Sequence, residues 1–463
     1  MYNILLIDRL GFLVDSVLQY TDWNISLLIV QDIASKNKYL NNARINKVYH
    51  STEFMQLENV ENIDFNYYKQ FEESFRIVDS GMRRIQYDYQ YSHYHFYMSL
   101  SLWRKIFTQY QFDFCMMSSI EHGITEDTIP IKVAVSLGIK FYTIAPINES
   151  ICIVYDYLND EMIQRSYDIS KKSVTELISK DAYYFKNIDK KDIAVKSSVR
   201  HYIGSCLFDM TGSLGYILYK CVKNRSLFFT WYEGRQIKTY LPNYVNCFIR
   251  WKYIQYKNEK RSVAADYSKK YVVYFMHFEP EAVVVNYSNY MDSQLIIIKI
   301  LAKALPYGWK LYVKEHPISR RLNKTSGFAH FIEFYSEYNS NWYWKKITEI
   351  ENVELIQINE SATKLITNSQ AVSTIAGTVI MEAVLENKPC VIFGDRKKVV
   401  FSRGKGIYFV SSFSECKSAL KEIQFDNEVN VEEIFSELAH YVIPHTSKGH
   451  AYGIKLISER LNL

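Results

Sequence analysis

The chain has 463 residues, of which 48% are hydrophobic and 23% are charged, and its formal net charge is +5. This length suits two domains of about 150–200 residues each, and the composition is that of a folded globular protein rather than a disordered one. The mild positive charge argues against a dedicated nucleic-acid-binding protein, for which a strongly basic surface is expected.

The cysteines and the N-terminal segment indicate where the protein works. Seven widely spaced cysteines contain no C-x-x-C pair, which predicts reduced thiols rather than a disulfide framework or a zinc site. The first residues, "MYNILLIDRLGF", enter a strand directly, without the basic and apolar regions of a signal peptide. No apolar run reaches the roughly 18–20 residues of a membrane span. We therefore expect a cytoplasmic protein.

Strand and helix patterns alternate in the first part of the chain. Apolar runs predict buried strands at residues 3–7, 24–30, 112–119 and 140–146. Residues 131–137 fit a helix that Gly138 ends. Because this β-α-β order is typical of a parallel sheet, we interpret residues 1–205 as one α/β domain.

Residues 206–265 differ from the rest in being basic and aromatic. Within 210–261 there are ten Lys or Arg residues but only two acidic ones, Glu233 and Glu259. One interpretation is a helical linker packed between domains. The other is an amphipathic surface that rests on an anionic membrane, where basic and aromatic residues suit the headgroup region.

The alternation of strands and helices resumes more clearly in residues 266–430. Strands are expected at 270–278, 309–314, 353–357, 371–374 and 389–395. Helices are expected at 291–305, 361–369 and 377–388. The short loops between them predict a second doubly wound domain. Residues 431–463 are expected to form helices that pack back on the domains.

Ligands of open parallel sheets bind beyond the carboxyl ends of the strands, so the residues that follow each strand are candidates for a site. In "STIAGTVIMEA", Ser373 and Thr374 end a strand, Gly377 permits close approach of the backbone, and Thr378 starts a helix. A helix N-terminus favours phosphate, and Glu382, one turn further, can accept hydrogen bonds from a ribose. Ordinary helix capping is the alternative interpretation.

The neighbouring strand ends in "KEHP". Lys314 offers a cation for phosphate, His316 offers a hydrogen-bond donor, and Pro317 stiffens the turn. A lone histidine is more often structural. Because two potential anion sites follow strands of one predicted sheet, we favour the interpretation that both bind nucleotide phosphates.

Other common signatures are absent from the sequence. There is no G-x-x-x-x-G-K-[ST] loop, no G-x-G-x-x-G after the first strand, and no G-x-S-x-G, H-E-x-x-H or D-x-D motif. The sequence therefore predicts neither a P-loop NTPase nor a typical NAD enzyme.

Residues of about 270–395, from "YFMHFEPEAVV" to "ENKPCVIFGD", resemble the capsule polysaccharide biosynthesis family, which includes bacterial transferases that add Kdo to the capsule lipid anchor. The most specific pieces of the resemblance are Pro280-Glu281, Asp292 with Gln294, the run 314–317 and the run 373–382.

The resemblance implies a GT-B architecture, in which two Rossmann-like doubly wound domains face a cleft. It implies a nucleotide-sugar-dependent glycosyltransferase (EC 2.4 class) that needs no metal or other cofactor. The donor, a CMP-Kdo-like or UDP sugar, would bind the C-terminal domain through the phosphate-site residues Lys314, His316, Pro317, Ser373, Thr374, Gly377 and Thr378 and the ribose-binding Glu382. The acceptor would be a capsule or surface polysaccharide or its lipid-linked primer.

The catalytic base is expected at a strand end of the first domain, where it can reach an acceptor hydroxyl. The candidates are Asp8, after the first strand, and Glu121 with His122, after the strand at 112–119. Asp8 can instead be a cap residue, and the other two can lie in a solvated loop. Glu279 and Glu281, in the second domain, are candidate donor-site or structural residues.

Two other functions stay open at this point. Teichoic-acid-type polyol-phosphate transferases share the architecture, and a non-catalytic assembly subunit could retain a nucleotide fold. The combination of Lys314, His316 and Glu382 favours a transferase. We expect it in the cytoplasm, peripheral at the inner face of the cytoplasmic membrane, where the basic segment would contact anionic lipid.

Overall fold

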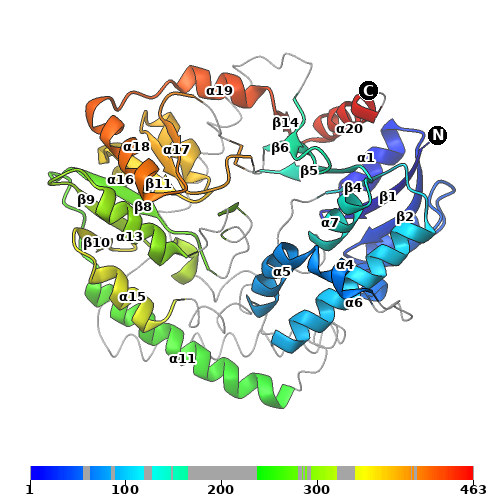
Figure 1. Ribbon diagram of the computed structural model, residues 1–463, viewed down its shortest axis with the longest axis horizontal. Helices are drawn as coiled ribbons and strands as arrows, with labels where there is room; N and C mark the ends of the chain where they lie inside the picture. The colour runs from blue at the N-terminus through cyan, green and yellow to red at the C-terminus, as the bar shows by residue number, and fades with distance from the viewer. Residues whose placement is uncertain are drawn as a thin grey trace.

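The computed structural model describes residues 2–55, 63–84, 89–118, 128–147, 150–164, 237–279, 284, 287–288, 293–320, 339–397, 399–400 and 404–461. The predicted residues Glu121, His122 and Glu281, and most of the basic segment, lie outside these ranges. Figure 1 shows two α/β lobes, with the N-terminus and the C-terminus both on the first lobe.

The first lobe is built on a mixed sheet in the order β14-β6-β5-β4-β1-β2-β3, with β7 paired to β6. Strands β5, β4, β1, β2 and β3 are parallel, whereas β6, β7 and β14 add antiparallel pairs. The strands are β1 (Asn3–Asp8), β2 (Asn24–Val30), β3 (Val48–His50), β4 (Phe114–Met117), β5 (Phe141–Pro146), β6 (Ile151–Asp156), β7 (Glu161–Met162) and β14 (Val442–Pro444).

Helices cover both faces of this sheet, so its central strands are apolar throughout. Leu5 and Ile7 pack on the side of α5, α6 and α7, and Ile4 and Leu6 pack on the side of α1 and α20. The helices of this lobe are α1 (Leu13–Tyr20), α2 (Ile33–Tyr39), α3 (Ser51–Met55), α4 (Phe65–Lys69), α5 (Glu72–Arg84), α6 (Tyr89–Gln109), α7 (Thr128–Ser136) and α20 (Ser447–Leu461).

The second lobe contains an all-parallel sheet in the order β10-β9-β8-β11-β12-β13. Its strands are β8 (Tyr271–Phe275), β9 (Lys310–Lys314), β10 (Val353–Ile356), β11 (Ala371–Thr374), β12 (Cys390–Ile392) and β13 (Ile407–Phe409). In chain order this is 3-2-1-4-5-6, the doubly wound Rossmann order, with the switch point between β8 and β11. Two such lobes confirm the predicted GT-B class.

Helices also sandwich the second sheet. One face packs against α11, α13, α15 and α18, and the other against α16, α17 and α19. The bounds are α11 (Ile237–Arg261), α13 (Gln294–Ala304), η1 (Pro317–Arg320, a 3₁₀ turn), α15 (Asn341–Thr348), α16 (Ala362–Asn368), α17 (Val379–Leu385), α18 (Phe413–Phe425) and α19 (Val431–Ala439).

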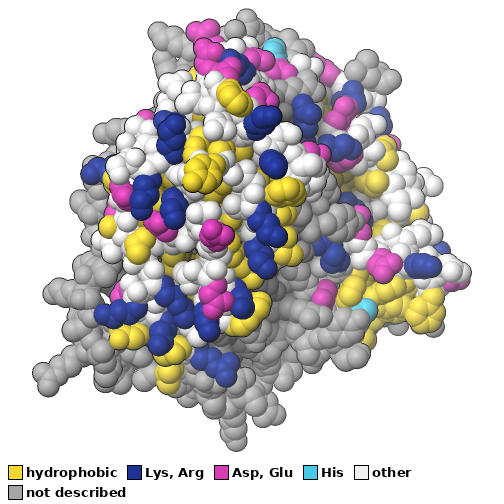
Figure 2. Space-filling view, turned by 60° about the vertical axis from the view of Figure 1, so that its left-hand side comes forward, with side chains coloured by type: hydrophobic (Ala, Val, Ile, Leu, Met, Phe, Trp, Pro, Cys, Tyr) yellow, Lys and Arg dark blue, Asp and Glu magenta, His cyan; other side chains and the backbone are white. Residues whose placement is uncertain are grey.

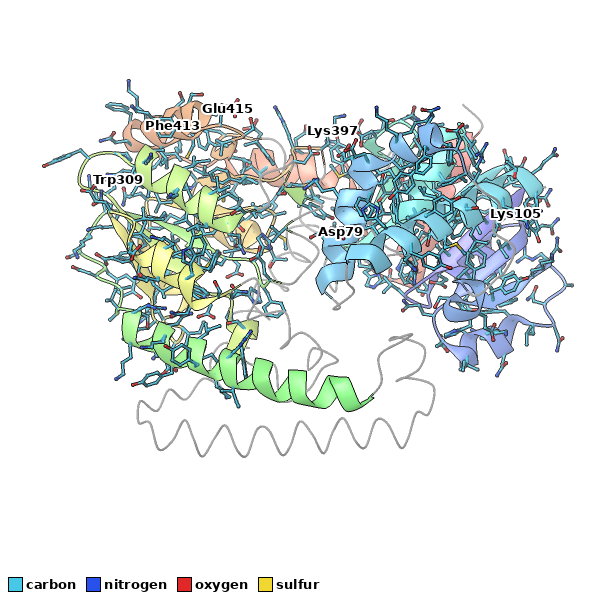
Figure 3. All side chains as sticks on the ribbon, turned by 60° about the horizontal axis from the view of Figure 1, so that its bottom comes forward. Asp79, Lys105, Trp309, Lys397, Phe413 and Glu415 are labelled. Atoms are coloured by element: carbon cyan, nitrogen blue, oxygen red, sulfur yellow. The ribbon has the colours of Figure 1, made fainter. Side chains whose placement is uncertain are left out.

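Among the described residues, apolar contacts and an ion pair connect the lobes. Ala145, Ile151 and Ile153 of the first sheet belong to the same buried cluster as the β11 and α17 residues of the second lobe. Lys397, which lies between the lobes in Figure 3, pairs its Nζ with Asp160 Oδ2 at 2.5 Å.

The C-terminal segment differs from the expected run of helices. Helix α19 ends at Ala439, and Val442–Pro444 forms β14, an antiparallel strand on β6. Val442 and Ile443 are buried, and burial on the sheet outweighs the continuation of a short helix. The chain thus returns to the first lobe before α20 begins.

The described part of the basic segment, residues 237–265, consists of α11 and the four residues after it. Trp251 and Ile254 are buried against the second lobe, while Ile249 and Tyr253 stay exposed. This arrangement agrees with a packed helical linker for residues 249–261. Figure 2 shows Lys and Arg side chains interspersed with acidic and hydrophobic ones over the face that carries the second lobe. No helix in the described ranges is both long and apolar enough to cross a membrane.

Candidate nucleotide site of the second lobe

The candidate site lies at the switch point of the second sheet, where β8 and β11 end side by side. Residues that follow three adjacent strands meet here: His277 after β8, His316 after β9, and the segment 374–378 after β11. This is the position at which doubly wound sheets bind ligands.

His277 is held by contacts to its backbone and to its ring. The buried Gln294 side chain accepts a hydrogen bond from the His277 N–H at 2.8 Å and donates one to the His277 carbonyl at 3.1 Å. Ala376 donates its backbone N–H to His277 Nε2 at 3.1 Å, and Thr374 Oγ1 lies 3.2 Å from the same nitrogen. The ring is therefore fixed against the turn between β11 and α17.

The ring contact sets the protonation state of His277. Because Nε2 accepts a hydrogen bond, the neutral ring carries its proton on Nδ1. Burial, and then the nearby His316 ring, lower the pKa of His277 to about 3. No described residue accepts a hydrogen bond from Nδ1. His277 thus presents a neutral N–H donor at the switch point.

The turn after β11 contains Gly377. A Cβ on Gly377 would lie 3.2 Å from Thr374 Oγ1, a tight contact, and 3.7 Å from His277 Cε1, an ordinary one. Thr378 is exposed at the start of α17 and does not cap that helix. Glu382 lies one turn into α17 and is partly buried. The predicted roles of Gly377, Thr378 and Glu382 stay predictions.

Two predicted phosphate-binding side chains have structural contacts instead. Lys314 is 3% exposed, and its Nζ donates to the carbonyls of Gln357 at 3.1 Å and Ile358 at 2.5 Å. Ser373 is fully buried and donates its hydroxyl to the Val391 carbonyl at 2.8 Å. These contacts contradict the prediction that Lys314 and the Ser373 hydroxyl meet donor phosphates. Both tie neighbouring strands together.

The "KEHP" turn is held in place by hydrogen bonds to Ser319 and, through it, to α11. Glu315 is buried and accepts a hydrogen bond from the Ser319 hydroxyl at 2.7 Å. The Ser319 carbonyl in turn accepts hydrogen bonds from Trp251 and Gln255 of α11. Pro317 begins the 3₁₀ turn η1, and His316 is partly buried beside Phe278, with ring centroids 6.3 Å apart. His316 thus lies on a rigid turn.

Of the acidic donor-site candidates, only Glu279 lies in the described part of the chain. It is 7% exposed, and its backbone carbonyl accepts a hydrogen bond from Asn339 Nδ2 at 3.3 Å. Such burial favours the structural alternative for Glu279.

The corresponding switch point of the first sheet lies between β1 and β4. Asp8 is 2% exposed there, and its carboxylate accepts hydrogen bonds from the backbone N–H groups of Gly11, Leu13 and Val14. Its oxygens thus bind the first turn of α1, which contradicts a role as the catalytic base. The buried Ser118 hydroxyl, after β4, accepts the Leu10 N–H at 3.0 Å.

The sequence prediction did not assign His277 to the site. Gln294 gave the available signal, because a glutamine at the start of an apolar helix is placed to bond the backbone of the residue after β8.

Comparisons with known proteins agree with the resemblance. Residues 229–402 match the family model described as "Capsule polysaccharide biosynthesis protein", which confirms the predicted resemblance over a segment that contains the whole switch point of the second sheet. No curated protein matches the chain.

Among solved structures, the UDP-GlcNAc 2-epimerase of Methanocaldococcus jannaschii is 12% identical, with 99% of each chain covered and a TM-score of 0.32. The glycotransferase of kitacinnamycin is 11% identical, with 99% of each chain covered and a TM-score of 0.27. The β-Kdo 2,7-transferase KpsC of Thermosulfurimonas dismutans is 14% identical over 46% of this chain and 62% of that chain, with a TM-score of 0.25.

Proposed function

We propose that the chain is a glycosyltransferase of capsule or surface polysaccharide synthesis, which moves a sugar from a nucleotide donor to a saccharide or glycolipid acceptor. The observation that carries this proposal is the neutral N–H donor of His277 at a doubly wound switch point, inside the segment that matches the capsule family model.

The donor's phosphates would bind where β8, β9 and β11 end. His277 would donate its Nδ1–H to a phosphate oxygen, and His316 would donate from the neighbouring strand end. Thr374, Gly377 and Thr378 would contribute backbone and hydroxyl groups, and Glu382 would hold the ribose.

These donors would act mainly on the leaving nucleotide. As the bond between sugar and phosphate breaks, negative charge grows on the phosphate oxygens, and fixed N–H groups stabilise that charge without reorganising. The reaction proposed here uses these side chains and needs no bound metal.

The first lobe would supply the acceptor site and the base. With Asp8 bound to the first turn of α1, Glu121 and His122 stay the proposed residues for removing the acceptor proton. The basic aromatic segment that leads into α11 would bring the enzyme to anionic lipid at the inner face of the cytoplasmic membrane, where lipid-linked acceptors are made.

A nucleotide screen tests the donor site. CMP, UDP, GDP and CDP are added separately to the full-length protein, and thermal unfolding is recorded. A nucleotide at a hundredfold excess over its dissociation constant stabilises the folded state by about 2.7 kcal/mol, a clear shift in Tm. Gly377→Ala should reduce the shift, because its methyl group would crowd Thr374 Oγ1 and cover the backbone beside His277. His440→Ala, at an exposed position, is the control.

The cognate nucleotide sugar then tests the reaction. Transfer to a lipid-linked saccharide acceptor, followed by mass spectrometry, is the expected outcome. Conversion of the donor sugar without an acceptor would point to an epimerase, and no response to any nucleotide would favour a non-catalytic subunit.

A further inference from the structure

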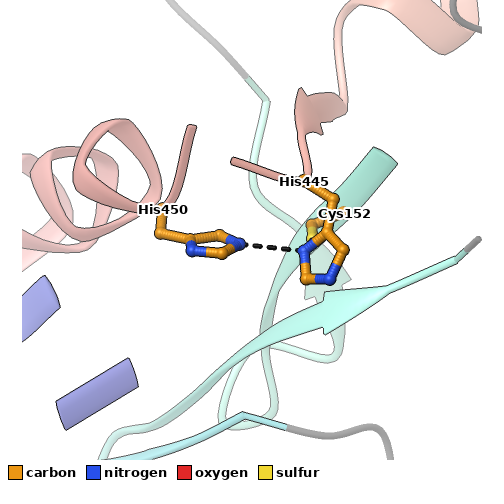
Figure 4. Close-up of side chains that lie close together, drawn as sticks. All are labelled: Cys152, His445 and His450. Atoms are coloured by element: carbon orange, nitrogen blue, oxygen red, sulfur yellow. Dashed lines mark hydrogen bonds between the residues drawn. The ribbon is translucent and has the colours of Figure 1, made fainter. Parts of the chain in front are cut away.

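A cluster of one cysteine and two histidines lies far along the chain from the nucleotide site. Cys152 comes from β6, His445 follows β14, and His450 lies in the first turns of α20 (Figure 4). Cys152 Sγ lies 3.0 Å from His445 Nδ1, which lies 2.9 Å from His450 Nε2. The three ligand atoms all lie within 4.8 Å of one another.

We propose that Cys152, His445 and His450 bind a zinc ion that fastens the C-terminal helix α20 to the first lobe. Thiolate sulfur and imidazole nitrogen are the usual zinc ligands in proteins, and H-x₃₋₅-H is a common ligand spacing. His445 and His450, with four residues between them, have that spacing.

His445 Nδ1 has two close partners but can make only one good hydrogen bond. An imidazole nitrogen has one in-plane position, occupied either by a proton or by a lone pair. Here two partners, at 3.0 and 2.9 Å, face that position. A cation between the three atoms would accept a lone pair from each at once.

The distances are close to those of a tetrahedral ion. With Zn–S near 2.3 Å and Zn–N near 2.0–2.1 Å, ligand atoms are about 3.3–3.6 Å apart. The Cys152–His445 and His445–His450 contacts are shorter by roughly half an ångström, and the Cys152–His450 pair lies within 4.8 Å, so the side chains need to shift to share one ion. Three protein ligands leave one tetrahedral position for water.

The backbone fixes the ligands in place. Ile443 pairs with Cys152 in the antiparallel β14–β6 ladder, and the His445 N–H donates to the Ser150 carbonyl at 2.7 Å. A Cβ on Gly449 would lie 1.9 Å from the Pro444 carbonyl oxygen, so only glycine lets α20 start this close to β14. Phe12 stacks on His450 with ring centroids 4.1 Å apart, which covers the cluster from the side of α1.

Binding releases one proton per ion. The Cys152 thiol loses its proton to solvent as the S–Zn bond forms, and each imidazole donates one lone pair while keeping the proton on its other nitrogen.

Metal analysis of the reduced, full-length protein tests the proposal. After incubation with Zn²⁺ and dialysis, wild type should retain about one zinc per chain, as expected for three protein ligands that the fold holds together. His445→Ala and His450→Ala should each weaken zinc affinity by more than about tenfold, since even outer-shell changes have effects of that size. His440→Ala, exposed at the end of α19, should bind zinc like wild type.

Cobalt substitution identifies the sulfur ligand. The Co²⁺ protein should show a thiolate-to-cobalt charge-transfer band that disappears in Cys152→Ser and persists in Cys390→Ser, a buried thiol whose contacts are backbone carbonyls. If Cys152→Ser does not fold, the double variant His445→Ala/His450→Ala must lose the band instead. Wild type that retains no zinc, or a band that survives these changes, would overturn the proposal.

Discussion

Ala376 donates its backbone N–H to Nε2 of His277 over 3.1 Å, joining residues 99 positions apart at the ends of β8 and β11. This bond leaves the ring proton on Nδ1, on the side away from the turn. One backbone contact thereby converts a histidine after a strand into an oriented neutral donor at the switch point.

Replacing His277 by Ala should weaken binding of the cognate nucleotide by about 10–100-fold, the loss expected for one hydrogen bond to a charged group. Isothermal calorimetry well below the Tm measures this without interference from lowered stability. His440→Ala serves as the matched control. If His277→Ala binds the nucleotide with unchanged affinity, His277 does not belong to the donor site.

The pH dependence of stability should change when His277 is removed. The pKa of His277 is about 3 in the folded chain against 6.5 ordinarily, so below pH 6.5 the unfolded chain binds a proton that the folded chain does not. Stability from the neutral ring is therefore complete above about pH 6.5 and falls as pH decreases, by up to about 1.4 kcal/mol per pH unit.

Urea unfolding of wild type and His277→Gln at about pH 7 and about pH 5 measures this. Wild type should lose more stability than the variant over the interval. Equal losses would show that His277 does not stay neutral in the folded chain. His450, whose pKa is also lowered, is present in both proteins and cancels in the comparison.

His316→Ala should abolish transfer and leave the fold intact. The ring is only partly buried, and the turn that carries it is held by Glu315, Ser319 and α11. We expect kcat/KM to fall by about 100-fold or more, as for loss of a preorganised donor to a developing negative charge. An unchanged circular-dichroism melting curve is the control, and wild-type turnover would rule out a donor-site role.

Lys314→Met should destabilise the protein rather than impair nucleotide binding. The change leaves the Gln357 and Ile358 carbonyls without their ammonium donor, a loss on the order of 2 kcal/mol or more. Chemical denaturation measures it, with the exposed Lys364→Met as control. If Lys314→Met has normal stability but no longer binds the nucleotide, Lys314 binds the donor phosphates after all.

Asp8→Ala should lower stability by about 1–2 kcal/mol or more, because its carboxylate caps three N–H groups at the start of α1. Turnover per folded molecule should stay near the wild-type value. If turnover disappears while the denaturation midpoint does not move, Asp8 is the base after all.

Strand positions followed closely from the sequence. The expected strands at 24–30 and 371–374 coincide with β2 and β11, and the strand expected at 309–314 contains β9. Each of these strands is buried on both faces of its sheet, and such burial requires a short continuous apolar run that can be recognised without any tertiary contact. The three-residue strand β14, by contrast, is too short for its apolar residues to predict a strand.

The polar residues after those strands were harder to interpret. Lys314 ends β9, His316 follows β9 and His277 follows β8, so all three lie near the same edge of one sheet. Which of them turns toward a ligand depends on partners distant in the chain, such as the Gln357 carbonyl for Lys314 and the Ala376 N–H for His277.

By itself, the sequence determined the two doubly wound domains and the positions of many strand ends, because alternating apolar patterns reflect burial that is local to each element. Only the tertiary structure decided that the Ala376 N–H bonds His277, that Lys314 bonds the Gln357 carbonyl, that Asp8 bonds the Leu13 N–H, and that Cys152 meets His445, 293 residues away. These outcomes depend on distances between segments that no local pattern encodes, since hydrogen bonds and metal coordination require atoms within a few ångströms.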